Sequence, residues 1–212
     1  MTYTCRFAPH SYSWVALHPK PKGVIQFIGG AFFGTYPTVF YRHFLSTLFD
    51  EGYTIVALPF RFTFRHWSIA LDLLEEHYAV RQSIVESAKK LGYETDIYLD
   101  ARQYAWVGHS LGCKYVALLE LLGAPPARFR EYCQTVGINP EQQQWIERSL
   151  ASLKETLAHL EHDIQALTGK SITYGQPSIL NEASLLMAPA ITDLEGAIPL
   201  QSLRRLFDRL LT

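Results

Sequence analysis

Residues 104–122 read YAWVGHSLGCKYVALLELL, and this stretch decides the fold. Its first residues are apolar and predict a buried strand, whereas its last residues have the apolar spacing of a helix. Between them lies GHSLG, a G-x-S-x-G pattern centred on Ser110. A serine on a sharp strand-to-helix turn needs small residues two positions before and after it, and Gly108 and Gly112 are the smallest residues available.

The bare G-x-S-x-G pattern is weak, because it arises by chance in roughly one chain in fifteen of this length. The flanking strand and helix make it more specific, since the start of a helix directs free N–H groups and a positive dipole end at the serine. We therefore predict that Ser110 is a nucleophile, that Leu111 donates its N–H to an oxyanion hole, and that Gly108 and Gly112 support the turn. The alternative is a tight turn with an incidental serine.

The first half of the chain alternates short apolar runs with helical patterns. Strands are predicted at residues 14–17, 23–28, 53–58 and 104–107, and helices at residues 38–49, 68–91 and 111–122. This alternation is typical of a parallel sheet with helices on both faces.

The strand at residues 23–28 ends in a pair of glycines. We predict that the N–H groups of Gly30 and Ala31 complete the oxyanion hole. The alternative is a glycine turn that lets the chain leave the sheet, and these residues alone favour neither interpretation.

The second half of the chain has a different pattern. Pro125 and Pro126 predict an irregular stretch, and Asn139-Pro140 predicts a helix start. An apolar seam then runs to Gly169 at Ile146, Leu150, Leu153, Leu157, Leu160, Ile164 and Leu167. The seam indicates a long helix that lies on the body of the protein, and the alternative is a homodimer through residues 145–168.

A strand at residues 184–189 and an amphipathic helix at residues 200–211 end the chain. Together the elements predict one α/β domain over residues 1–212, with a mostly parallel sheet. A helical insertion is expected at about residues 124–183, before the last strand.

Composition excludes several classes of protein. Hydrophobic residues make up 48% of the chain and charged residues 18%, as in ordinary globular proteins. A net charge of −1 gives no field that would gather nucleic acid. We expect no membrane span, no metal site and no cofactor, because apolar runs are short and no phosphate-binding glycine motif follows a strand. Three widely spaced cysteines predict a cytoplasmic location.

Nearly half of the aromatic residues lie between Phe27 and Trp67. Several follow strand ends, where open parallel sheets bind ligands: Phe32, Phe33, Tyr36, Phe60, Phe62, Phe64 and Trp67. They predict either an apolar pocket for an acyl or prenyl group or simply part of the core. Arg61, Arg65 and His66 either bind an anionic group or belong to a solvated loop.

The chain resembles the α/β-hydrolase superfamily in four segments, at residues 23–34, 53–67, 106–114 and 184–199. More narrowly, it is similar to an uncharacterised hydrolase-like family of unknown function, known mainly from photosynthetic organisms. The resemblance implies a hydrolase-like fold with Ser110 at the nucleophile elbow, and it implies no substrate.

Hydrolases of this fold carry serine, acid and histidine in that order along the chain. Asp193 lies near the position of the acid in some relatives, and we expect it to be the acid here. The last histidines, His159 and His162, are predicted on the outer face of the long helix. The C-terminal strands of the fold are expected to be absent. A truncated chain, a base recruited from elsewhere such as His66, and a fold without catalysis each explain this gap.

The sequence therefore predicts a serine hydrolase for esters or thioesters of an apolar small molecule. The alternative is a non-catalytic binding or scaffold protein that keeps the hydrolase-like fold.

Overall fold

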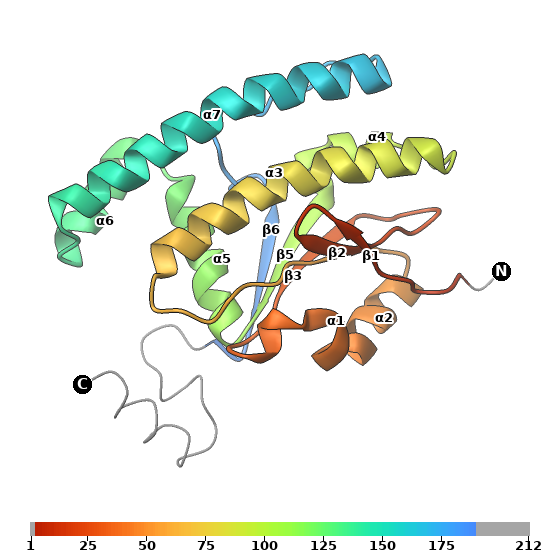
Figure 1. Ribbon diagram of the computed structural model, residues 1–212, viewed down its shortest axis with the longest axis horizontal. Coiled ribbons are helices and arrows are strands. Elements are labelled where there is room, and N and C mark those ends of the chain that lie inside the picture. The colour runs from red at the N-terminus through yellow and green to blue at the C-terminus, as the bar shows by residue number, and fades with distance from the viewer. Residues whose placement is uncertain (1–2, 190–212) are drawn as a thin grey trace, which may run out of the picture.

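The computed structural model describes residues 3–189, which form one sheet with helices packed around it (Figure 1). The strand order is β1-β2-β4-β3-β5-β6. Strands β4, β3, β5 and β6 run parallel, whereas β1 and β2 form an antiparallel hairpin at one edge. The bounds are Ala8–His10, Ser13–Ala16, Val24–Ile28, Thr54–Ala57, Tyr104–His109 and Ala183–Met187 for β1 to β6. The predicted α/β class with a mostly parallel sheet is confirmed.

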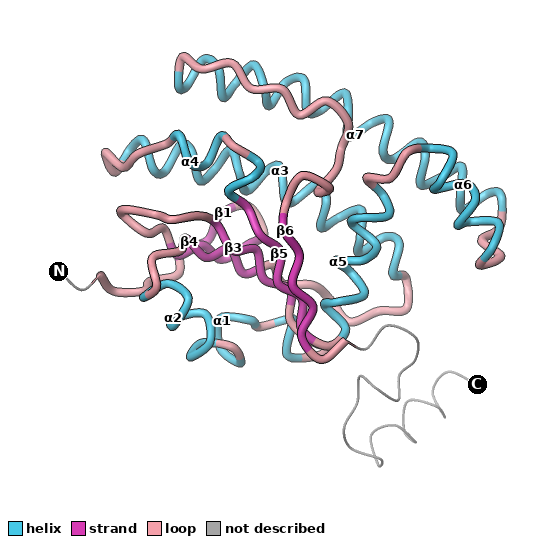
Figure 2. The backbone as a smooth tube through the Cα atoms, turned by 180° about the vertical axis from the view of Figure 1, so that it is seen from behind, coloured by secondary structure: helices cyan, strands magenta, loops and turns pink. Residues whose placement is uncertain are grey.

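Helices cover both faces of the sheet, as predicted. Helices α1 and α2 lie on one face, α3 and α5 lie on the other, and α7 lies outside α3 (Figures 1 and 2). The bounds are Pro37–Phe40, Arg42–Asp50, His66–Lys90, Asp96–Leu99, Leu111–Leu122, Pro126–Thr135 and Pro140–Thr168 for α1 to α7. Short 3-10 turns occupy Phe33–Thr35 and Ala101–Gln103.

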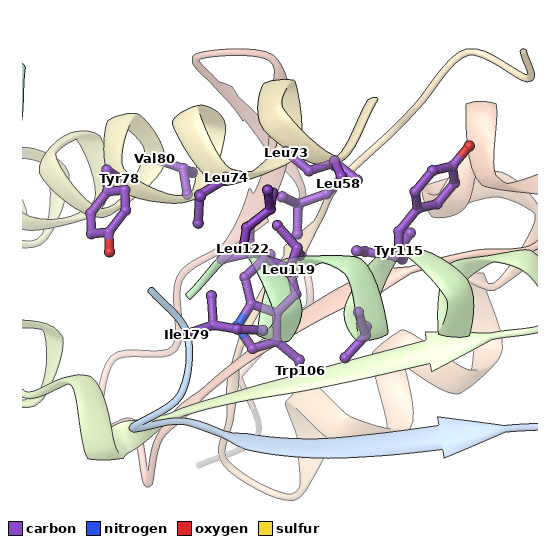
Figure 3. Packing of buried hydrophobic residues seen from close by; sticks show 14 of the residues in the cluster. Leu58, Leu73, Leu74, Tyr78, Val80, Trp106, Tyr115, Leu119, Leu122 and Ile179 are labelled. Atoms are coloured by element: carbon purple, nitrogen blue, oxygen red, sulfur yellow. The ribbon is translucent and has the colours of Figure 1, made fainter. Parts of the chain in front are cut away.

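Strand β3 is buried on both faces, and its alternating side chains divide the core into two clusters. Val24 and Ile28 belong to the larger cluster, under α3 and α5. Ile25 and Phe27 belong to the smaller one, against α2. Figure 3 shows the larger cluster, where side chains of α3 and α5 meet above Trp106 of β5. A strand buried on both faces explains why apolar residues occupy adjacent positions on each side of Gln26.

The apolar seam of α7 packs on the protein's own body. Ile146, Leu153, Leu157 and Ile164 are buried, and the other three seam residues are partly buried against the larger core cluster. Asn139 caps the helix by accepting from the N–H of Gln142 at 2.7 Å, as its N-cap pattern predicts. A homodimer through residues 145–168 stays a prediction, and it would have to use the outer face of α7.

Three sequence expectations need correction. The strand predicted first, at residues 14–17, is the second strand, because residues 8–10 pair with it in a hairpin. The single helix predicted at residues 38–49 is two helices that meet at Tyr41. The stretch after Pro125 is helix α6, in which Pro126 takes the first position, where a proline costs no hydrogen bond.

A cluster of polar side chains is buried between β3, β5 and α3. The Glu182 carboxylate accepts from Trp106 Nε1 at 2.6 Å and from Gln26 Nε2 at 3.1 Å. Its Oε1 lies 3.2 Å from His77 Nε2 and 3.4 Å from Arg81 Nη1, and all three charged or titratable side chains are at most 2% exposed. Glu182 directly precedes β6, so this cluster anchors the last described strand to the centre of the fold.

The expected helix at residues 200–211, the expected acid Asp193 and the expected absence of further strands lie outside the described residues. Between residues 3 and 189, no helix is both long and apolar enough to span a bilayer.

Candidate functional site

Ser110 is the one residue between the end of β5 at His109 and the start of α5 at Leu111. Its backbone has φ 54° and ψ −118°, a conformation that costs a residue with a side chain of the order of 1–3 kcal/mol. Two backbone hydrogen bonds hold Ser110 in this conformation. The N–H of Ser110 donates to the carbonyl of Met187 at the end of β6, and its carbonyl accepts from the N–H of Cys113. The strain is therefore built into the junction of two strands and a helix.

The two glycines of the motif make this turn sterically feasible. A Cβ on Gly108 would lie 2.8 Å from the backbone nitrogen of Cys113. A Cβ on Gly112 would lie only 2.1 Å from the carbonyl oxygen of Ile28. The start of α5 is thus pressed directly against the end of β3, and no side chain fits between them.

Replacing Gly112 with alanine is expected to destabilise the protein by at least about 2 kcal/mol. In a helix exposed to solvent, replacing glycine with alanine would instead stabilise the protein by about 1 kcal/mol. The sign of the change in stability therefore shows whether Gly112 is packed against β3. Urea unfolding measures it. The control is Gly92→Ala, where the added Cβ meets nothing within 4 Å and only the positive φ of 69° opposes the change. A Gly112→Ala protein as stable as the parent would contradict the close packing.

The loop after β3 reaches the serine. A Cβ on Gly30 would lie 3.1 Å from Ser110 Cβ and 3.4 Å from Ser110 Oγ. The N–H of Gly30 is already engaged, because it donates to the Tyr41 hydroxyl at 2.8 Å. Within residues 3–189, the N–H groups of Ala31 and Leu111 have no acceptor. The structure thus brings Gly30, Ala31, Ser110 and Leu111 together, with two of the three N–H groups free.

Tyr41 is a site residue that the sequence reasoning missed. Its hydroxyl lies 2.9 Å from His109 Nδ1, so it links the loop after β3 to the end of β5. Its ring packs edge-on against Phe27, at 4.7 Å between centroids. The sequence offered no signal for this role, because Tyr41 falls within a continuous helical pattern and only the break between α1 and α2 points its side chain at the loop.

Backbone strain gathers at the ends of the parallel strands. Four non-glycine residues between 3 and 189 have positive φ. Phe32 follows β3, Ser110 follows β5 and Ala188 follows β6, whereas the fourth residue, Ser11, forms the β1–β2 turn. Strained conformations persist where surrounding structure imposes them, and they are common at functional sites.

Most of the aromatic residues after the strand ends are exposed. Phe32 is 40% exposed, Phe33 48% and Tyr36 63%, whereas Phe60 is buried at 5%. Phe62 packs on Phe32 and on Phe64, at 4.7 and 5.6 Å between ring centroids. The core interpretation therefore holds for Phe60, and Phe62 and Trp67 are partly buried against the same core. The other four rings are exposed at the edge of the sheet where Ser110 lies.

Two histidines lie near this edge, and within residues 3–189 neither ring forms a hydrogen bond with Ser110. His66 Nδ1 lies 3.3 Å from the Tyr115 hydroxyl, and His109 Nδ1 faces Tyr41. Between residues 3 and 189, no side chain forms a hydrogen bond with Ser110 Oγ. His159 and His162 are exposed on the outer face of α7, as predicted. The acid predicted at Asp193 lies outside the described residues.

The lowered pKa values of four histidines predict how the free energy of unfolding depends on pH. Burial lowers the pKa of His10, His77 and His109, and burial together with the Lys114 charge lowers the pKa of His66 to about 4. The unfolded chain, with histidine pKa values near 6.5, then binds more protons than the folded chain below that pH. Stability should be full above about pH 6.5 and fall as the pH drops below it.

Urea midpoints at pH 7.5 and pH 5.0 test this expectation. The midpoint should be lower at pH 5.0, and His66→Asn should reduce the difference. A midpoint that is unchanged or higher at pH 5.0 would show that these histidines do not carry the predicted shifts.

Three esterases of known structure show a distant similarity to this chain. A putative carboxylesterase from Lactobacillus plantarum is similar at 15% identity and a TM-score of 0.44, over 94% of this chain and 64% of that one. This chain therefore spans less than two thirds of its length. An esterase from Thermogutta terrifontis is similar at 14% identity and a TM-score of 0.38, over 98% and 93% of the two chains. An esterase from the archaeon Pyrobaculum calidifontis is similar at 12% identity and a TM-score of 0.36, over 93% of this chain and 78% of that one.

No curated protein matches the chain significantly. A family described as "Protein of unknown function (DUF1350)" matches residues 9–124, from the β1–β2 hairpin to the end of α5. The match contains the loop after β3, Tyr41 and the Ser110 turn. Because the matched residues make up more than half of the chain, the chain belongs to the DUF1350 family.

Proposed function

We propose that the protein is a cytoplasmic serine hydrolase that cleaves an ester or thioester of an apolar small molecule. One observation carries the proposal: Ser110 is held at positive φ between β5 and α5, with Gly30 packed against it. This is the geometry that a nucleophile elbow requires. The free thiols of Cys5, Cys113 and Cys133 are in keeping with a reducing compartment.

In this proposal Ser110 Oγ attacks the carbonyl carbon and forms the new C–O bond. The carbonyl oxygen takes up the electron pair and becomes an oxyanion, which accepts from the free N–H groups of Leu111 and Ala31. Gly30 contributes room rather than a donor, because its N–H is bonded to Tyr41. The alcohol or thiol then leaves with a proton, and water hydrolyses the acyl-serine. Asp193 remains the proposed acid.

The proton of the Ser110 hydroxyl needs a base. His66 is the first candidate, because it lies at the carboxyl edge of the sheet. Burial and the Lys114 charge lower its pKa to about 4, so the imidazole is neutral at pH 7 but a weaker base than an ordinary histidine. The exposed rings of Phe32, Phe33 and Tyr36 support an apolar substrate, since they line the approach to the same edge.

Chromogenic esters of increasing chain length test the proposal. We expect saturable hydrolysis of p-nitrophenyl butyrate and octanoate, faster than hydrolysis of the acetate. The His66→Gln protein should hydrolyse all three esters more slowly than the parent. Folded protein that hydrolyses none of these esters faster than buffer would contradict the proposal. An unchanged rate in His66→Gln would remove His66 as the base and leave the role of Ser110 intact.

A non-catalytic binding or scaffold protein is the second candidate. The observation that favours it is that Ser110 Oγ has no hydrogen-bond partner among residues 3–189. This candidate predicts binding of apolar esters without turnover, which the same assay separates from hydrolysis.

A further inference from the structure

A cavity of about 690 Å³ is lined by residues at the start of α3 and by residues of α5, α6 and α7. We call it the α3 pocket. Its walls include four aromatic side chains, Phe64, Trp67, Tyr132 and Trp145. Ser110 is not among the residues that line it. The pocket shares His66 with the proposed catalytic residues but does not include the serine itself, and two of its walls lie on helices beyond the family match.

The α3 pocket is lined by basic side chains, with no acidic residue among the lining residues. The basic residues are Arg65, His66 and Lys114. Between residues 3 and 189, neither Arg65 nor Lys114 forms an ion pair with a carboxylate. Lys114 is half-buried, and burial lowers the pKa of its amine. A half-buried cation without a counter-ion is unfavourable, and a bound anion would relieve that cost.

The other large cavities carry both signs. The cavity of about 570 Å³ between α5, α6 and α7 contains the ion pair of Arg130 with Glu147, at 3.1 Å. The cavity of about 450 Å³ near α4 contains the ion pair of Lys170 with Asp96. Among these cavities, the α3 pocket is thus the one lined by basic side chains without an acidic one.

The backbone at the pocket adds to the positive potential. Helix α3 begins at His66, its N-cap residue Arg65 provides no side-chain cap, and its first turn carries no acidic residue. The first N–H groups of the helix, at His66, Trp67 and Ser68, belong to residues that line the pocket. These groups have no partner within the helix and add a partial positive charge beside Lys114.

We propose that the α3 pocket binds an organic anion, a carboxylate, phosphate or sulfonate attached to an apolar or aromatic body. Lys114 and Arg65 contact the anionic group, and the rings of Trp67 and Trp145 contact the body. This assignment does not rest on the proposed hydrolase activity, because it uses neither Ser110 nor its neighbours.

Two fluorescent probes that differ in one charged group test the assignment. 8-Anilinonaphthalene-1-sulfonate carries the anion, whereas N-phenyl-1-naphthylamine has the same rings without it. We expect the sulfonate to bind about tenfold more tightly than the neutral probe, the effect of one charge-assisted hydrogen bond. Lys114→Met should remove this preference by weakening the sulfonate alone, and Lys114→Arg should retain it. Energy transfer from tryptophan to the bound sulfonate should fall in Trp145→Phe.

Lys154→Met is the matched control, because Lys154 lines the neighbouring apolar cavity between α5, α6 and α7. It should leave the affinities of both probes unchanged, as should Ser110→Ala. The thermal midpoint of Lys114→Met should equal or exceed that of the parent, since the change removes an unpaired cation. Equal affinities for the two probes would overturn the assignment. So would loss of sulfonate binding in Lys154→Met but not in Lys114→Met.

Discussion

The Ser110→Ala protein is expected to hydrolyse p-nitrophenyl butyrate at least about 10³-fold more slowly than the parent. The reason is that the proposed reaction passes through a covalent acyl-serine, which alanine cannot form. A residual rate above that of buffer is expected, because the free N–H groups of Ala31 and Leu111 would still bind the oxyanion. Steady-state kinetics of the two proteins measure the loss.

Stability separates this loss from misfolding. Ser110 Oγ forms no hydrogen bond within residues 3–189, so the urea midpoint of Ser110→Ala should correspond to a change of no more than about 1–2 kcal/mol. Ser13 offers a control, because its buried hydroxyl also has no partner and it lies in β2, away from the serine turn. Ser13→Ala should keep full activity. Turnover that survives in Ser110→Ala would show that the reaction takes another route.

The Glu182→Ala protein is expected to lose about 3–5 kcal/mol of folding free energy. Alanine would leave the Arg81 guanidinium without its counter-ion, 2% exposed in the core. It would also leave the indole N–H of Trp106 and the amide of Gln26 without their acceptor. Because Glu182 anchors β6 and the carbonyl of Met187 accepts from Ser110, the serine turn should loosen too.

Urea unfolding of Glu182→Ala and Glu182→Gln tests this expectation. Glutamine keeps an acceptor for Trp106 but not the charge, so its loss should be smaller than that of alanine. The ion pair of Arg102 with Asp100 provides the comparison, because the Arg102 side chain is 80% exposed, and Arg102→Ala should lower stability much less than Glu182→Ala. A Glu182→Ala protein within 1 kcal/mol of the parent would mean that the cluster contributes little net stability.

Local patterns were sufficient for the elements of this fold whose signals lie within a few residues. The β-branched run of β3, the N-cap at Asn139 and the left-handed Gly169 that ends α7 are such cases. Helix α6 was missed because the two prolines at its start also fit an irregular stretch. The β1–β2 hairpin was missed because Ala8–His10 is short and contains a proline.

The contacts of the site could be predicted only in part. The spacing of Gly108, Ser110 and Gly112 indicated a tight turn, and a parallel sheet brings the loop after β3 to the same edge. The bond from Gly30 to Tyr41 depends on a break within a helical pattern. The Glu182 cluster joins residues 26, 77, 81, 106 and 182, and no short-range pattern relates positions so far apart along the chain.

Reaction of the protein with a fluorophosphonate probe, read by intact mass, tests the central claim most directly. Such probes bond covalently to an activated serine hydroxyl, so they report the chemistry of Ser110 without knowledge of the substrate. We expect a single adduct on the parent protein, mapped to the peptide that contains Ser110, and no adduct on Ser110→Ala. A well-folded parent protein that forms no adduct, or an adduct that persists in Ser110→Ala, would contradict the assignment of Ser110 as the nucleophile.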